Sequence, residues 1–243
     1  MLTLPTGKFL EHLFRKYCFR CGYVCERFMK NGFKLLIMAL LIKIYPDNPN
    51  ERQMRTVVEC LRDGGIIVYP TDTIYGIGCD IFKSKSVEKI CELRGIKPGK
   101  AMFSFICSDV SQLSDYCKPI ENNIFKAMKA NLPGPFTFIL NASNNVPRHI
   151  QSKRKTVGIR IPDNPITLEI VRLLGNPIMS TSVHDDDEIL EYTTDPELIY
   201  EKFANNVDLV IDAGIGGNIP STVLDCTDGE VIITREGKGV LRY

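Results

Sequence analysis

Short apolar runs alternate with segments of helical periodicity from Met38 onward. Runs that are rich in Ile, Val and Leu and bounded by turn residues predict buried strands. Such runs occur at 40–45, 65–69, 102–107, 136–140, 156–161, 177–182, 207–212, 222–225 and 231–234. The strand pattern therefore extends over nearly the whole chain beyond Met38.

Between these runs, apolar residues recur three and four positions apart, which predicts amphipathic helices. Asn-Pro or Asp-Pro pairs mark several helix starts, because they place a good N-cap before a proline suited to the first helical position. The expected helices run from Asn48-Pro49 to Gly64, from Ser84 or Ser86 to Arg94, over 120–131, from Asn164-Pro165 to Leu174 and from Asp195-Pro196 to about 205. Interleaved strands and helices predict an α/β fold, with a mixed sheet because the closing strands lie too close together for crossover helices.

Charge is distributed unevenly, although the overall composition is ordinary. Of 243 residues, 24% are charged, and the formal net charge of +1 gives no global signature of a nucleic-acid-binding or membrane protein. Residues 1–37 hold seven Lys or Arg and two Asp or Glu, which leaves residues 38–243 net acidic. We therefore expect an N-terminal extension, residues 1–37, that is disordered or lies upstream of a natural start at Met38, and one domain, residues 38–243.

Neither a membrane span nor a disulfide framework is expected. The apolar run 33–45 is shorter than the about 20 residues that cross a bilayer, and no small-residue cleavage site follows it. Of the nine cysteines, an odd number, six are scattered through apolar stretches at 60, 79, 91, 107, 117 and 226, which favours buried free thiols in a cytoplasmic protein. Cys18, Cys21 and Cys25 are spaced like the start of a zinc site with His12 nearby, and their role is left open.

A polar segment follows the predicted strand 65–69. Pro70 ends that strand because proline has no N–H to give to the ladder. Residues 70–78 then bring two threonine hydroxyls, one carboxylate and two glycines to the end of the strand. Ligands bind at such strand ends in open α/β sheets, whereas Thr and Asp also cap ordinary surface turns. Both interpretations are open for this segment alone.

Cationic side chains gather at strand ends and in loops, at Lys97, Lys100, Lys153, Arg154, Lys155, Arg160 and Arg235. Arg160 differs from the others because it lies in an otherwise apolar predicted strand. A charge held there needs a partner, which is either a ligand carboxylate or phosphate or a structural ion pair.

Hydrolytic chemistry has little support. The histidines, at positions 12, 149 and 184, are not spaced to activate a serine nucleophile. Hydroxyls at Ser180, Ser182 and Ser221 follow or precede strands, where serine commonly caps turns. The acidic run 185–188 is typical of a solvated loop, with Mg²⁺ binding near phosphates as the alternative.

Five motifs, taken in order, resemble those of one family: 70–76 (PTDTIYG), 133–137 (PGPFT), 156–162 (TVGIRIP), 220–223 (PSTV) and 235–237 (REG). They look like the motifs of the YrdC/YciO-like family, and 44–49 (IYPDNP) looks most like its YciO branch. The resemblance runs from about residue 40 to residue 240 and leaves out the first 37 residues. It implies a YrdC-like twisted mixed sheet with flanking helices and a basic concave cavity.

The best-known members of this family make threonylcarbamoyl-adenylate from threonine, bicarbonate and ATP, with release of pyrophosphate, for threonylcarbamoyladenosine modification of tRNA. The resemblance thus implies a nucleotidyltransferase of the threonylcarbamoyl-AMP synthase type, with ATP as a substrate and Mg²⁺ assisting the pyrophosphate. It places Thr71, Arg160, Ser180 and Ser221 on the threonine side of the cavity, and Arg94, Thr156, Ser182 and Arg235 on the nucleotide side.

The chain departs from the synthase pattern on the ATP side. The Lys-x-Arg pair of the synthases corresponds to Arg94-Gly95-Ile96, and their Ser-x-Asn signature to Ser182-Val183-His184. Ile96 cannot bind phosphate, and Lys97 or Lys100 are candidates to replace the missing cation. Two alternatives to synthase activity follow. One is hydrolysis of the adenylate, and the other is binding of tRNA or double-stranded RNA through phosphate contacts that weaken with salt.

Overall fold

The computed structural model describes residues 38–96, 103–183 and 194–242, and the expected extension over residues 1–37 lies outside them. Ten strands of the described chain form one sheet. The strands are β1 (Leu40–Lys43), β2 (Ile67–Tyr69), β3 (Gly76–Asp80), β4 (Ser104–Ile106), β5 (Phe136–Asn141), β6 (Thr156–Arg160), β7 (Ile178–Ser182), β8 (Leu209–Asp212), β9 (Thr222–Asp225) and β10 (Ile232–Arg235). The helices are α2 (Glu51–Arg62), α3 (Ser84–Leu93), α4 (Val110–Ser114), α5 (Asn122–Asn131), α6 (Pro165–Leu174) and α7 (Pro196–Phe203).

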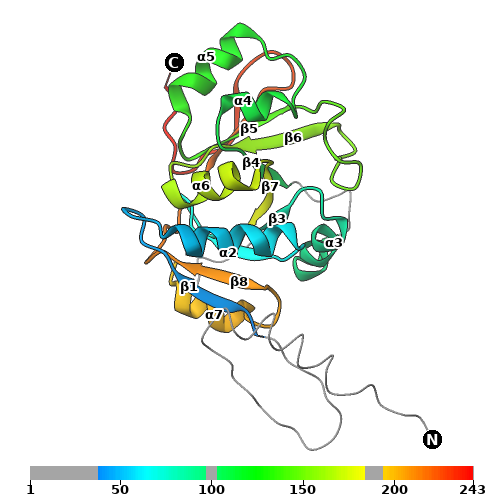
Figure 1. The fold of residues 1–243 in the computed structure, drawn as a ribbon. Helices are drawn as coiled ribbons and strands as arrows, with labels where there is room; N and C mark the ends of the chain where they lie inside the picture. Colours follow the sequence, from blue (N-terminus) through cyan, green and yellow to red (C-terminus); the bar gives the residue numbers. More distant parts are fainter. Residues whose placement is uncertain (1–37, 97–102, 184–193, 243) are drawn as a thin grey trace, which may run out of the picture. The chain divides into compact units, whose positions relative to one another are not determined.

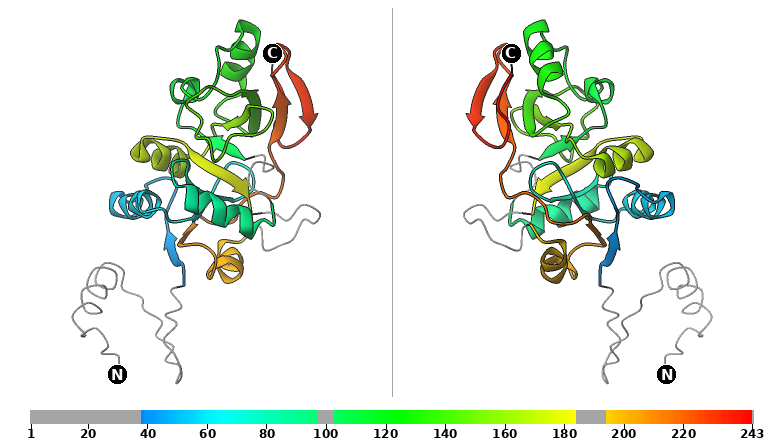
Figure 2. Two further views of the ribbon diagram at one scale, coloured as in Figure 1. Left: turned by 90° about the vertical axis from the view of Figure 1, so that its right-hand side faces the viewer. Right: turned by 90° about the vertical axis from the view of Figure 1, so that its left-hand side faces the viewer.

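The sheet is mixed, as the sequence predicts. Its strand order is β1-β8-β2-β3-β7-β4-β6-β5-β9-β10. Strands β1 and β2 are parallel to β8, β4 is parallel to β6, and β5 is parallel to β9, whereas the other neighbours are antiparallel. Figures 1 and 2 show β1, in blue, and the β9–β10 hairpin, in red, at opposite ends of the sheet. The predicted α/β class is therefore confirmed.

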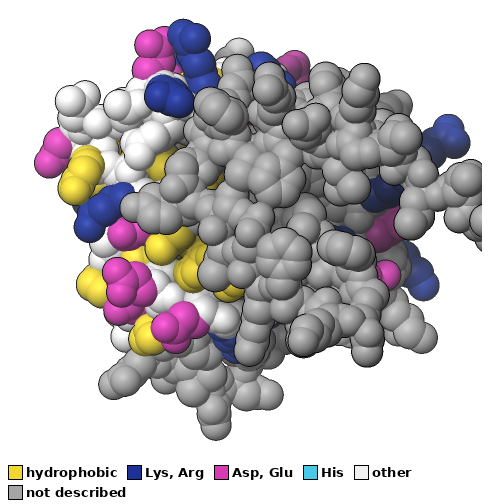
Figure 3. Space-filling view, turned by 60° about the horizontal axis from the view of Figure 1, so that its bottom comes forward, with side chains coloured by type: hydrophobic (Ala, Val, Ile, Leu, Met, Phe, Trp, Pro, Cys, Tyr) yellow, Lys and Arg dark blue, Asp and Glu magenta, His cyan; other side chains and the backbone are white. Residues whose placement is uncertain are grey.

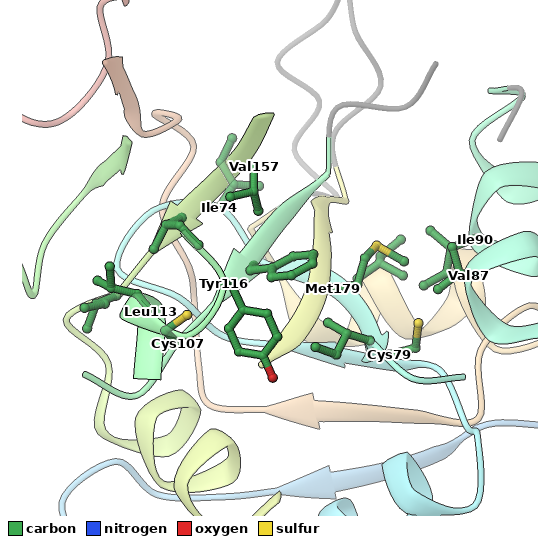
Figure 4. Packing of buried hydrophobic residues seen from close by; sticks show 14 of the residues in the cluster. Ile74, Cys79, Val87, Ile90, Cys107, Leu113, Tyr116, Val157 and Met179 are labelled. Carbon is green, nitrogen blue, oxygen red and sulfur yellow. The ribbon is translucent and has the colours of Figure 1, made fainter. Parts of the chain in front are cut away.

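The larger hydrophobic core lies on the face of the sheet that packs against α3, α4, α5 and α7, which we call the α3/α5 face. In the strand register, Cys79, Met179, Phe105, Ile159 and Phe138 form one row across five strands. Each of them is at most 1% exposed. Figure 4 shows Val87 and Ile90 of α3 packed near Met179 and Cys79 of this row. Burial of this row stabilises the centre of the sheet.

The opposite face packs against α2 and α6, and we call it the α2/α6 face. Ile67 and Tyr69 of β2, Ile178 of β7 and Ile106 of β4 form a second core with apolar side chains of these two helices. Figure 1 shows α2 and α6 on the same side of the sheet. Since successive side chains of a strand lie on opposite faces, this core and the first one share the same strands.

A row without apolar side chains lies on the α2/α6 face, directly beside the second core. Gly78, Ser180, Ser104 and Gly158 are aligned across β3, β7, β4 and β6. The two serines of this row present hydroxyls, and the two glycines present backbone. A helix packed on this row would find no apolar side chains to contact. The row is therefore suited to a polar floor, and it leads to the strand end that carries Arg160.

Helix starts agree with the sequence at α6 and α7 and differ at α2 and α3. Asn164 and Asp195 cap α6 and α7, and each is followed by proline. The N-cap of α2 is Asn50, whose side chain accepts from two backbone N–H groups, so the prediction of Asn48 is wrong. Helix α3 begins after Lys83 without a side-chain cap, so the predicted serine cap is wrong as well.

Other sequence interpretations concern thiols and membranes. Cys79, Cys91, Cys107, Cys117 and Cys226 are buried free thiols, and Cys60 is half-buried and also free. Among the helices of the described ranges, none is long and apolar enough to cross a bilayer.

Figure 3 shows acidic, basic and apolar side chains interspersed over the described part of one face.

Replacing Ile170 by alanine is expected to lower the free energy of unfolding by about 2–5 kcal/mol, because its buried side chain would leave a cavity between α6 and the sheet. Ile170 is 0% exposed, whereas Leu198 on α7 is 39% exposed. Leu198→Ala is therefore the matched control, with an expected change of about 0.5 kcal/mol or less. Urea denaturation measures both values. Equal decreases in the free energy of unfolding of the two variants would show that the packing of Ile170 between α6 and the sheet does not stabilise this core.

Candidate functional site

Arg160, the last residue of β6, holds the turn that follows β2. Its Nη2 atom donates to Asp72 Oδ1 at 3.0 Å and to Thr73 Oγ1 at 2.9 Å. The exposed fractions of the Arg160 and Asp72 side chains are only 13% and 8%. Because water screens such a pair weakly, the ion pair fixes the turn against the end of β6.

The ion pair uses only part of its hydrogen-bonding capacity. Asp72 Oδ2 and Arg160 Nε are buried and lack a hydrogen-bond partner among the described residues. A bidentate arginine–carboxylate pair engages both oxygens and two N–H groups, whereas this pair is joined through Oδ1 alone. Each unpaired buried group costs about 1–3 kcal/mol. The pair therefore leaves one acceptor and one donor unused.

The hydroxyl of Thr71 is engaged within its own turn. It donates to Ile74 O at 2.7 Å and accepts from the Thr73 N–H at 3.0 Å. Its oxygen also lies 3.1 Å from Thr73 Oγ1. Thr167 Oγ1 of α6 donates to Pro70 O, which ties the turn to that helix. The contact of Thr71 with threonine therefore remains a prediction. In this structure the Thr71 hydroxyl makes its hydrogen bonds within the turn.

A second group of hydroxyls lies where β9 begins. Ser221 Oγ is 2.8 Å from Thr137 Oγ1, and Arg235 Nη2 donates to Ser221 O at 2.8 Å. Gly237 makes this approach possible, because a Cβ there would lie 2.4 Å from Pro220 O and 2.6 Å from Ser221 O. The 235–237 motif therefore has a steric reason for its glycine.

Three cations converge near the 71–73 turn. Burial and the charge of nearby Arg160 lower the pKa of Arg235, and Lys238 Nζ donates to Asp72 O at 2.5 Å. Cations held this close together favour an anionic ligand. We call this group the Arg160 cluster, and its members are Asp72, Thr73, Thr137, Arg160, Ser221, Arg235 and Lys238.

Tyr69 connects the core under α2 and α6 with this region. Its side chain is fully buried, and its hydroxyl donates to Ser180 Oγ. The ring lies over β3, where a Cβ on Gly76 would be 2.7 Å from Tyr69 Cζ and one on Gly78 would be 3.0 Å from Cε1. Burial raises the pKa of Tyr69 to about 12, although the Ser180 hydrogen bond and the Arg160 charge act in the other direction.

Thr156 lies at the other end of β6, beside a hollow of about 250 Å³. The hollow is lined by Ile139, Asn141, Arg154, Thr156, Asp225, Thr227 and Asp228, and we call it the Thr156 hollow. Thr156 and Arg160 lie on the same face of β6 because side chains alternate along a strand. Four residues of extended chain separate them by about 13 Å. The two regions therefore open on one face of the sheet.

Comparison with known proteins places this arrangement in a family. Residues 59–237 match the sequence model of the Sua5/YciO/YrdC family, which is described as telomere recombination. The chain belongs to the Sua5/YciO/YrdC family. The resemblance predicted from the five motifs is thereby confirmed, and the matched range contains all of them.

Individual relatives fall into two groups within the Sua5/YciO/YrdC family. YciO of Escherichia coli is 43% identical over 204 residues, which cover 83% of this chain and 97% of YciO. A threonylcarbamoyl-AMP synthase of Coxiella burnetii is 29% identical over 184 residues, which cover 74% of this chain and 96% of that protein.

The similar solved structures also include YciO and Sua5 proteins. The crystal structure of E. coli YciO superposes with a TM-score of 0.78 at 41% identity and covers 84% of this chain and 98% of YciO. The crystal structure of P. abyssi Sua5 complexed with L-threonine superposes with a TM-score of 0.74 at 27% identity and covers 82% of this chain and 58% of Sua5. Fold and family thus support a Sua5/YrdC-type domain of the YciO kind.

The predicted site residues of this Sua5/YciO/YrdC domain fall into separate places. Arg160 and Ser221 meet at the Arg160 cluster together with Arg235, which the resemblance had put on the nucleotide side. Ser180 lies in the Gly-Ser row and contacts Tyr69. Thr156 lies at the hollow at the other end of β6.

The remaining predicted nucleotide residues lie at the ends of β7 and α3. Ser182 is exposed at the end of β7, opposite Gly76. Arg94 is the C-cap of α3, where its N–H donates to Ile90 O at 3.0 Å. Ile96 packs against the α3/α5 core, which gives a physical reason for an apolar side chain at this departure from the synthase motif.

Some sequence predictions lie outside the described residues, namely those for Cys18, Cys21, Cys25, Lys97, Lys100, His184 and the acidic run 185–188. Conversely, the structure adds residues that the sequence analysis did not assign to one side of the predicted site. Asp72, Thr73 and Thr137 lie inside the quoted motifs, so the motifs could have pointed to them. Lys238 and Tyr69 reach the site through tertiary contacts, and no local pattern marks them.

Tyr69→Phe is expected to reduce the loss of stability that alkaline pH causes. The pKa of Tyr69 is raised from 10.0 to about 12 in the folded protein, so the unfolded chain loses this proton first. Stability is therefore fully present below pH 10 and falls as the pH rises to about 12. The contribution of one such buried tyrosine is on the order of 2 kcal/mol.

The free energy of unfolding, measured in urea at about pH 8 and about pH 11, checks this expectation. Its decrease between the two pH values should be smaller in Tyr69→Phe than in the wild type. Tyr45, which is 64% exposed, supplies the control variant Tyr45→Phe, which should behave as the wild type. Identical decreases in all three proteins would contradict the proposed role of burial.

Proposed function

We propose that the Arg160 cluster binds L-threonine and that the chain is an enzyme of the threonylcarbamoyl-AMP synthase type. The observation that carries this proposal is the Asp72–Arg160 pair, which keeps one buried donor and one buried acceptor unused. An amino acid carries a carboxylate that suits the cations, and an ammonium or hydroxyl group that suits Asp72. The L-threonine complex of the related Sua5 supports this choice of ligand.

The proposed reaction asks the protein for positioning and charge neutralisation. Threonine nitrogen combines with bicarbonate to give a carbamate and water. A carbamate oxygen then attacks the α-phosphorus of ATP, and pyrophosphate leaves with the electron pair of the broken P–O bond. Negative charge on the phosphates is stabilised by nearby cations, a role that suits Arg235 and Lys238. No covalent protein intermediate is required.

Mg²⁺ would enter this reaction with ATP. Among the residues that the structure describes, no three or more His, Cys, Asp or Glu side chains are grouped to hold a metal ion. Mg²⁺ in nucleotide sites keeps several waters and binds mainly substrate phosphates. The described residues therefore do not fit a metal site of their own, and no step of the proposal passes through one.

RNA binding is a second candidate, favoured by a basic turn before β6. Three consecutive cationic residues are exposed in this turn, namely Lys153, Arg154 and Lys155. The backbone of Lys155 is in the left-handed region, with a φ of 54°. The turn is fixed because the Lys155 N–H donates to Ser152 O at 3.0 Å. RNA contacts at such a turn would be made to phosphates and would weaken steeply with salt, whereas threonine binding at the half-buried Arg160 cluster would not.

Synthase activity is tested with the full chain, L-threonine, bicarbonate, Mg²⁺ and ATP labelled at the α-phosphate. The expected products are threonylcarbamoyl-AMP and an equal amount of pyrophosphate, and omission of threonine should abolish both. If neither product forms, the synthase proposal is wrong. Preformed threonylcarbamoyl-AMP then tests the hydrolase alternative, and a salt titration of tRNA binding tests the RNA alternative.

Arg160→Ala is expected to weaken L-threonine binding at least about tenfold, because a hydrogen bond to a charged group contributes about 1.5–3 kcal/mol. Isothermal titration calorimetry measures the affinity, and urea denaturation confirms that the variant is folded. Arg172→Ala is the matched control, since Arg172 pairs with Glu169 on the exposed surface of α6. Wild-type affinity in a folded Arg160→Ala protein would make Arg160 a purely structural residue.

A further inference from the structure

The segment that follows β10, residues 236–242, folds back along the start of β9, and we call it the C-terminal strap. The Gly237 N–H donates to Thr222 Oγ1 at 3.1 Å, and the same hydroxyl donates to Gly239 O at 2.7 Å. Figures 1 and 2 show the end of the described chain, in red, beside α5. The C-terminal strap therefore runs from the start of β9 to α5.

Alternate positions of the C-terminal strap face the core. A Cβ on Gly239 would lie 2.6 Å from Phe136 Cζ, so the backbone passes directly over that buried ring. Leu241 packs against the larger core, whereas Val240 between them is 83% exposed. Because only one leucine and one glycine face the core, packing alone holds this segment weakly. Its hydrogen bonds therefore decide where it lies.

Asn131, the last residue of α5, holds the far end of the C-terminal strap. It is buried, with only 6% of its surface exposed. Its Nδ2 atom donates to Arg242 O at 2.8 Å, and its Oδ1 atom accepts from the Arg242 N–H at 2.9 Å. The second Nδ2 hydrogen bond goes to Ala127 O at 2.7 Å. One amide thus pairs with both backbone groups of Arg242, as a neighbouring strand would. Since both of its donors are used inside the protein, Asn131 is not itself a ligand contact.

Lys238 lies at the near end of the C-terminal strap, four residues before Arg242. Its backbone N–H donates to Pro220 O at 2.8 Å, and its Nζ atom donates to Asp72 O at 2.5 Å. The residue is exposed, and a solvated lysine side chain samples many rotamers. The position of its ammonium group therefore depends on where the strap holds its backbone.

We propose that Asn131 is a positioning residue of the Arg160 cluster. It fixes the C-terminal strap at Arg242, and the fixed strap keeps the Lys238 ammonium beside the Asp72 turn, where its charge attracts an anionic ligand. When the pairing of Asn131 with Arg242 is lost, the cluster loses one cation while the core stays folded. That the anion is the carboxylate of threonine rests on the proposed function, whereas the control of Lys238 by Asn131 does not.

The reactivity of the Lys238 amine tests this inference without any ligand. The full chain is treated with a low concentration of acetic anhydride, and acetylation of each lysine is followed by mass spectrometry. Asn131→Ala should raise the acetylation rate of Lys238 at least about threefold, because the strap opens more often, and leave that of the exposed Lys153 unchanged. Asn176→Ala is the matched control, because the Asn176 side chain also donates two hydrogen bonds, both outside the strap. An unchanged Lys238 rate in Asn131→Ala would overturn the inference.

A second pair of variants changes the C-terminal strap instead of α5. Arg242→Pro removes the N–H that donates to Asn131 Oδ1, whereas Arg242→Ala keeps it. Only Arg242→Pro should raise the acetylation rate of Lys238. Because residue 242 is exposed, neither change disturbs the core, and this pair decides the question even if urea denaturation shows that Asn131→Ala is unfolded. Equal rates in the two Arg242 variants would contradict the positioning role.

Affinity for L-threonine, measured by calorimetry, tests whether Asn131 acts through Lys238. Lys238→Met removes the charge and keeps most of the apolar stem. We expect it to bind about threefold more weakly, as is usual for one exposed charge, with a smaller loss at high salt. Asn131→Ala should weaken binding to a similar extent and have no further effect in the Lys238→Met background. A loss that is equally large in both backgrounds would show that Asn131 does not act through Lys238.

Failure of this inference can be told from failure of the proposed function. If the wild type binds no L-threonine, the proposed function is wrong, and the acetylation rates of Lys238 decide the role of Asn131. If L-threonine binds and Asn131→Ala changes neither acetylation nor affinity, the inference is wrong and the threonine site stands. If Asn131→Ala changes the acetylation of Lys238 but not the affinity, Asn131 does not position a binding group, and the inference is wrong as well.

Discussion

Side chains alternate between the two faces of β3, β7, β4 and β6, and this alternation constrains both the stability and the chemistry of the domain. On one face the aligned residues are Cys79, Met179, Phe105 and Ile159. One position along each strand, the aligned residues on the other face are Gly78, Ser180, Ser104 and Gly158. A shift of register by one residue would exchange the two rows. The apolar row therefore fixes the position of the polar row.

The Arg160–Asp72 pair contributes less to the stability of the fold than a fully hydrogen-bonded pair would. A pair with so little exposure would be more stable if every polar atom were satisfied, yet Asp72 Oδ2 and Arg160 Nε are left unpaired among the described residues. Lys238 adds a further cation at the backbone of the same turn. Such an arrangement is unfavourable for the free protein, and the proposed threonine ligand would have to bring these atoms within reach to supply the missing partners.

Local sequence patterns predicted the architecture well and the site only in part. The Asn164-Pro165 start of α6 could be predicted because capping depends on neighbouring residues alone. At α2 the same pattern at Asn48 failed because Asn50, two residues further on, offers an equally good cap. Strand β3 was not predicted, since its glycines have low strand propensity. Its glycines leave room for the Tyr69 ring, because a Cβ on Gly76 would lie 2.7 Å from Tyr69 Cζ. Thr71 was predicted as a ligand contact from its motif, but the turn that engages its hydroxyl is visible only in three dimensions.

The β9–β10 hairpin has a consequence for the dynamics of binding. Strand β10 lies at the edge of the sheet, and all four of its residues are exposed. Edge strands with few buried contacts open locally at a lower free energy than the core. Since Arg235 ends β10, each opening of this strand removes a cation from the Arg160 cluster while the core remains folded. For the proposed threonine site, the fraction of time that the edge is closed would then scale the apparent affinity, so that affinity would depend on edge stability as well as on the residues that touch the ligand.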